Sequence, residues 1–77
     1  MLYFLDGTEM KTAAEAHGYL AKALGFPEYY GKNLDALYDC LTDMAKAEIF
    51  LTSSEQVDPK VMRVIKDASD CFRLIIL

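Results

Sequence analysis

The feature that most limits how this chain can fold is the alternation of short apolar runs with segments of helical periodicity. The apolar runs are Leu2 to Leu5, Glu48 to Thr52 and Cys71 to Leu77, and each has the length and composition of a β-strand. Two helical segments separate the first two runs, and one separates the last two. The order β-α-α-β-α-β predicts an α/β fold, in which a three-stranded parallel sheet packs with three main helices as a single domain over residues 1–77. The first run is expected to be buried, and the nearly continuous run "CFRLIIL" is typical of a strand covered on both faces.

End signals bound each of the three predicted helices. Thr12, with a glutamate three residues later, forms a capping box, and Gly25 ends the first helix. Asn33 is the expected N-cap of a second helix that runs to about Met44. Asp58 caps the third helix, with a proline at its first position.

Composition and charge restrict the class of function. An apolar fraction of 53% is high enough to fill a core, and 12 acidic against 8 basic residues leave a net charge of −4. Binding to nucleic acid through its phosphates needs clustered lysine and arginine, so the chain is expected to bind no nucleic acid directly. With no signal-peptide pattern in "MLYFLDG" and no run of about 20 apolar residues, we expect a cytoplasmic protein without a membrane segment.

The cysteines and the histidine show no pattern of a chemical site. Cys40 and Cys71 have neither metal-ligand nor redox-pair spacing, and they are expected to be buried, reduced thiols, although sequence does not exclude a bridge between them. His17 is expected to be a surface or half-buried residue of the first helix. Without a nucleophile, a phosphate-binding loop or a histidine cluster, the sequence predicts no enzyme, no metal and no cofactor.

The second predicted helix carries three aspartates four residues apart: Asp35, Asp39 and Asp43. At 100° per residue they lie on an arc about 100 to 180° from Leu34, while the leucines of this helix and Met44 share another arc that faces the core. Each repulsion at i,i+4 costs about 0.2–0.5 kcal/mol, and this helix has no lysine to offset it. The pattern indicates either a solvated acidic face or an anionic contact surface beside tyrosines.

The stretch "FPEYYGKNLDALYDCL" closely resembles the barstar family, the small intracellular inhibitors of barnase-type ribonucleases, and the last helix and strand resemble that family more weakly. The resemblance implies a protein, monomeric when free, that inserts its second helix and the preceding loop into the active site of a small basic ribonuclease. Tyr38 stands where the family usually has a tryptophan, "TDMAKAE" replaces a glycine–tryptophan pair, and the link before the last helix is short. The partner-binding residues that it implies, with Asp39 dominant, are Tyr29, Gly31, Asn33, Asp35, Tyr38, Asp39 and Asp67.

One alternative function remains open from the residues. The chain could be an acidic immunity or interaction module whose basic protein partner is not a barnase-type ribonuclease. Both functions need an acidic face and a basic partner, so sequence alone does not separate them.

Overall fold

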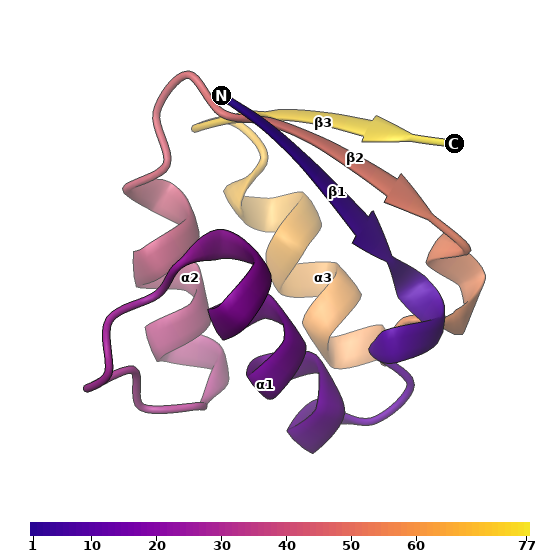
Figure 1. The fold of residues 1–77 in the computed structure, drawn as a ribbon, viewed down its shortest axis with the longest axis horizontal. Helices are drawn as coiled ribbons and strands as arrows, with labels where there is room; N and C mark the ends of the chain where they lie inside the picture. Colours follow the sequence, from indigo (N-terminus) through magenta and orange to yellow (C-terminus); the bar gives the residue numbers. More distant parts are fainter.

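The computed structural model describes residues 1–77 and has the predicted order of elements (Figure 1). Three helices and a three-stranded parallel sheet confirm the predicted fold class. No helix is both long and apolar enough to span a membrane. The elements are β1 (Leu2–Asp6), the 3₁₀ turn η1 (Gly7–Glu9), α1 (Ala13–Leu24), α2 (Leu34–Thr42), β2 (Glu48–Thr52), the 3₁₀ turn η2 (Ser54–Gln56), α3 (Pro59–Ala68) and β3 (Arg73–Ile76).

The strands follow one another across the sheet in the order β1-β2-β3. In the register of the parallel strands, Tyr3 pairs with Ile49, and Ile49 pairs with Leu74. Each crossover therefore leads from one strand to the next in the same direction across the sheet. Crossovers that share this direction and the same handedness place their helices on the same face of the sheet. Figure 1 shows all three helices on one side of the strands.

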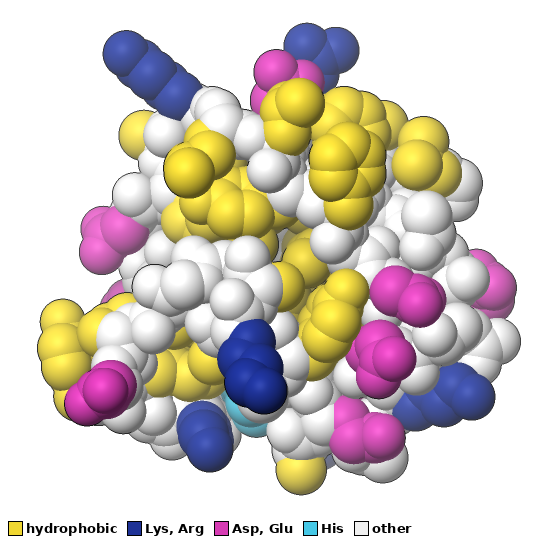
Figure 2. All heavy atoms as spheres, in the orientation of Figure 1, with side chains coloured by type: hydrophobic (Ala, Val, Ile, Leu, Met, Phe, Trp, Pro, Cys, Tyr) yellow, Lys and Arg dark blue, Asp and Glu magenta, His cyan; other side chains and the backbone are white.

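The other face of the sheet is uncovered, so the prediction of a last strand covered on both faces is wrong. Phe4 is 70% exposed, and its ring stacks on that of Phe50 with centroids 5.1 Å apart. In β1 only Leu5 is buried, which also corrects the prediction of a buried first strand. Hydrophobic side chains gather over the strands in Figure 2. The apolar runs thus indicated strands correctly, but not how many of their faces are covered.

The core lies between the helices and the inner face of the sheet. Leu20 of α1, Leu37 of α2, Val61 of α3 and Leu51 of β2 are fully buried members of one hydrophobic cluster. α2 also packs against α3. Burying one leucine stabilises the fold by about 1.5–3 kcal/mol, so these side chains fix the position of α2 and leave its opposite arc free.

The end signals of the helices are confirmed, with one difference. The Thr12 hydroxyl accepts a hydrogen bond from the Glu15 amide at 3.2 Å, and Gly25 takes the left-handed conformation with φ 70°. The Asp58 carboxylate accepts from two amides of the first turn of α3. α2 ends at Thr42 rather than near Met44, because residue 43 is its C-cap.

His17 and the cysteines lie where the sequence did not place them. His17 is only 5% exposed, because it belongs to the buried stripe of α1 that contains Leu20 and Leu24. Cys71 is exposed, because it lies in the turn before β3, and Cys40 is partly buried; both are free thiols.

Candidate partner-binding surface

Two consecutive tyrosines in the α1–α2 loop have opposite surroundings. Tyr30 is 8% exposed, and its ring contacts those of Phe26 and His17, with centroids 4.9 and 5.7 Å away. Tyr29 is 89% exposed. The amide of Tyr30 donates to the carbonyl of Pro27 at 2.9 Å, which tightens the loop. Tyr30 thus anchors the loop on the core, and Tyr29 is presented to solvent.

The anchor is a polar pair within the core. The Tyr30 hydroxyl lies 2.6 Å from Nδ1 of His17. Burial, followed by the charge of Cys40, raises the pKa of Tyr30 to about 12. Burial also lowers the pKa of His17; Asp58 opposes this effect and Lys32 adds to it. Both groups are therefore neutral at pH 7, and their hydrogen bond satisfies two polar side chains that the loop would otherwise bury unpaired.

Asn33 fixes the start of α2. Its side chain accepts a hydrogen bond from the Ala36 amide at 2.8 Å, as expected of an N-cap. The left-handed residue of the turn is Lys32, with φ 52°, and not Gly31. A Cβ at Gly31 would lie 3.1 Å from the side-chain nitrogen of Asn33. A side chain at residue 31 would therefore press on the cap residue, whereas a positive φ is not what Gly31 supplies.

The acidic arc of α2 faces solvent, as its spacing predicted. Asp35 and Asp39 are exposed, while Leu37 and Leu41 on the opposite arc are buried. Tyr38 lies between the two arcs and is 45% exposed. Asp35 is in the first turn, where the helix dipole favours a carboxylate by about 0.3–1 kcal/mol. The rest of the arc lacks that stabilisation.

A hollow of about 370 Å³ separates the α1–α2 loop from the second half of α2. It brings Tyr29 from the loop and Asp39 from the helix to one site, together with Asp43 at the end of the helix. Phe26 and Met44 are among its apolar lining, and no lysine or arginine lines it. The surface therefore combines aromatic and aliphatic contact area with negative charge.

Asp67 belongs to a different hollow, which is lined also by Arg63, Lys66 and Met62 of α3. Two cationic side chains thus lie beside Asp67, whereas the hollow of Tyr29 and Asp39 has none. The structure does not bring Asp67 to that hollow.

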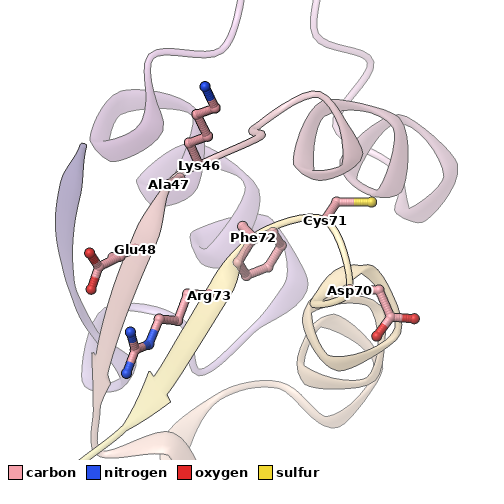
Figure 3. A pocket seen from close by; sticks show the side chains of 7 residues that line it. All are labelled: Lys46, Ala47, Glu48, Asp70, Cys71, Phe72 and Arg73. Atoms are coloured by element: carbon pink, nitrogen blue, oxygen red, sulfur yellow. The ribbon is translucent and has the colours of Figure 1, made fainter.

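The hollow at the amino-terminal ends of β2 and β3 offers no convergent chemistry. Figure 3 shows that Lys46, Glu48 and Asp70 point in different directions around it. No group of three or more histidine, cysteine or acidic side chains is placed to hold a metal ion. The hollow between the α1–α2 loop and α2 can therefore supply contact area and electrostatic attraction for a partner.

Comparison with known proteins decides the family. The sequence model of the family described as "Barstar (barnase inhibitor)" matches residues 1–75. This chain belongs to the barstar family. Members of that family are inhibitors rather than enzymes, which agrees with the absence of catalytic motifs from the sequence.

The barstar resemblance extends to a curated protein from Bacillus subtilis (strain 168) that bears the name "Putative ribonuclease inhibitor YrdF". The two are 50% identical over 38 residues, which is 49% of this chain and 42% of the relative. The matched segment thus spans less than half of either protein.

The barstar-like contact set predicted from sequence omits most residues that line the hollow, among them Phe26, Asp43 and Met44. Asp43 carried a usable signal, because it is four residues after Asp39 and continues the same arc. Phe26 carried none, since its position depends on how the loop folds back over α2.

Proposed function

We propose that this chain inhibits a small basic ribonuclease by placing the α1–α2 loop and the acidic arc of α2 in the enzyme's active site. Membership of the barstar family supports the class of function. The observation that carries the site is the hollow that the exposed residues Tyr29 and Asp39 both line. Both are on the motif that this chain shares with the family.

The mechanism is steric blockade combined with mimicry of an anion. A ribonuclease that binds RNA phosphates has arginine, lysine and histidine in its cleft. The carboxylates of Asp35 and Asp39 can occupy the positions of phosphates and form charge-assisted hydrogen bonds with those groups. The net charge of −4 also accelerates association with a basic enzyme, in a way that weakens with salt.

The remaining members of the proposed contact set have supporting tasks. Tyr29 and Tyr38 offer exposed rings beside the carboxylates, and such rings are frequent anchors in interfaces. Gly31 and Asn33 keep the loop in shape and let the partner approach its backbone. Asp67 joins the set only through its alignment with a family contact, because it lines a different hollow from Tyr29 and Asp39.

An inhibition assay tests the proposal. The chain is titrated into a barnase-type ribonuclease while cleavage of a fluorogenic RNA is measured. Activity should fall to zero at one equivalent of inhibitor, and the Glu55→Gln variant, changed at an exposed carboxylate in η2, should inhibit equally. Undiminished activity at excess inhibitor would rule out this target, and affinity capture with the wild-type chain and Asp39→Ala would then identify a basic partner of another kind.

A further inference from the structure

We infer that the hollow between the α1–α2 loop and α2 receives a cationic side chain of the protein partner, and that Asp43 binds it together with Asp39. This inference rests on the proposed function, and it extends the binding surface beyond the residues that the family resemblance implies. Its occupant is an arginine or lysine side chain. Three observations lead to it.

The first is the lining of the hollow. Leu24, Phe26 and Met44 give it apolar walls, while Asp39 and Asp43 supply its charges. Arginine and lysine side chains have the matching form, since an aliphatic stem packs on apolar surface while the charged head reaches a polar group. The volume of about 370 Å³ lies at the small end of the range of about 300–1,000 Å³ for ligand pockets.

The second is the concentration of negative charge. The lining contains two carboxylates and no cation. Both carboxylates act on Cys40, which also lines the hollow: burial raises the pKa of its thiol, and Asp43 and then Asp39 raise it further. Both charges therefore lie at the same hollow.

The third is the unfavourable position of Asp43 in the free protein. Asp43 is the C-cap of α2, at the negative end of the helix dipole, and the last turn has no basic residue. Asp39 lies four residues earlier, at a spacing where like charges repel. Asp43 is thus destabilised in the free protein by the helix dipole and by the charge of Asp39. Such a residue is expected to have a compensating role, and a bound cation would offset both repulsions.

Surface plasmon resonance tests this inference. The rate constants kon and koff are measured for binding to a catalytically disabled barnase-type ribonuclease at physiological salt. Asp43→Asn should raise koff about ten-fold and change kon less than about two-fold, because a docked contact affects dissociation whereas a distant charge affects association. Asp43→Lys should raise koff by more than about a hundred-fold. Glu55→Gln is the matched control for charge, since it removes an exposed carboxylate of η2, far from α2 in Figure 1, and it should leave koff unchanged.

The outcomes separate this inference from the proposed function. If Asp39→Ala weakens binding while koff of Asp43→Asn equals that of Glu55→Gln, the hollow is not a cation site and the inhibitor function stands. If the wild-type chain does not bind the enzyme, both are overturned. Asp43→Asn should fold as the wild-type chain does, because asparagine at a helix C-cap is free of the repulsion that Asp43 suffers, and circular dichroism checks this.

Discussion

At the scale of single residues, neighbours in the sequence differ sharply in their tasks. Tyr29 and Tyr30 are identical, yet one is exposed at the candidate site and the other holds the loop on the core through His17. Periodicity did not separate them, because both lie in a loop where no repeating pattern applies. The burial of His17 was predictable from its spacing, since it precedes Leu20 by three residues and Leu24 by seven. Its polar side chain instead favoured a position at the surface.

The buried His17 predicts a dependence of stability on pH. Its pKa is lowered in the folded protein, so the unfolded chain takes up a proton first as the pH falls. The stabilising contribution is therefore complete above the ordinary histidine pKa of about 6.5, and it is lost as the pH falls towards the folded pKa. Urea unfolding at pH 7.5 and 5.5 should show this loss in the wild-type protein and less of it in His17→Gln.

This chain has a single histidine, which makes that comparison direct. His17→Gln keeps a polar group beside Tyr30. The quantity compared between the two proteins is the change in the free energy of unfolding from pH 7.5 to pH 5.5. An equal loss of stability in both proteins would assign the effect to carboxylates instead.

At the scale of the elements, α2 depends on its first residues to present the acidic arc. Asn33→Ala removes the hydrogen bond to the Ala36 amide, and it should lower the free energy of unfolding by about 0.5–2 kcal/mol. Asn33→Asp keeps an acceptor at the cap and should lose less. Urea denaturation of the two variants checks the difference, and equal losses would show that the cap is not what Asn33 contributes to stability.

The start of α2 was predictable and its end was not. Asn33, the leucines that follow it and the three aspartates define a helix and its two arcs from sequence alone. The residues "DMAKAE" that follow α2 favour a longer helix by propensity, but Asp43 is its C-cap and Lys46 takes a left-handed conformation, with φ 67°. The turn into β2 overrides propensity there, and no residue marks it beforehand.

At the scale of the whole molecule, the layout is one layer of helices on one face of a sheet. The number and order of the elements were predictable, because each apolar run and each cap has a local signal. Which faces of the sheet the helices cover was not predictable, since this depends on the strand order β1-β2-β3, which sequence alone does not determine. The runs of β1 and β3 are apolar on both faces, although only Leu5 is buried in β1 and no residue of β3 is more than partly buried.

The one-sided core predicts unequal effects of truncation. Leu37→Ala should cost about 2–5 kcal/mol, because Leu37 is fully buried between α2 and the rest of the core. Phe4→Ala should cost less than about 1.5 kcal/mol, because the ring is mostly exposed and loses mainly its stacking on Phe50. Equal losses in urea unfolding would mean that the outer face of the sheet is covered in solution.

The most direct test of the inhibitor function is calorimetric titration of this chain into a catalytically disabled barnase-type ribonuclease, at low and at physiological salt. We predict tight binding at a ratio of one to one that weakens with salt, and a loss of at least about 2 kcal/mol in Asp39→Ala with folding intact; the weight given to Asp39 is inherited from the family. Absence of binding at both salt concentrations, or equal affinity of Asp39→Ala and the wild-type chain, would contradict the account.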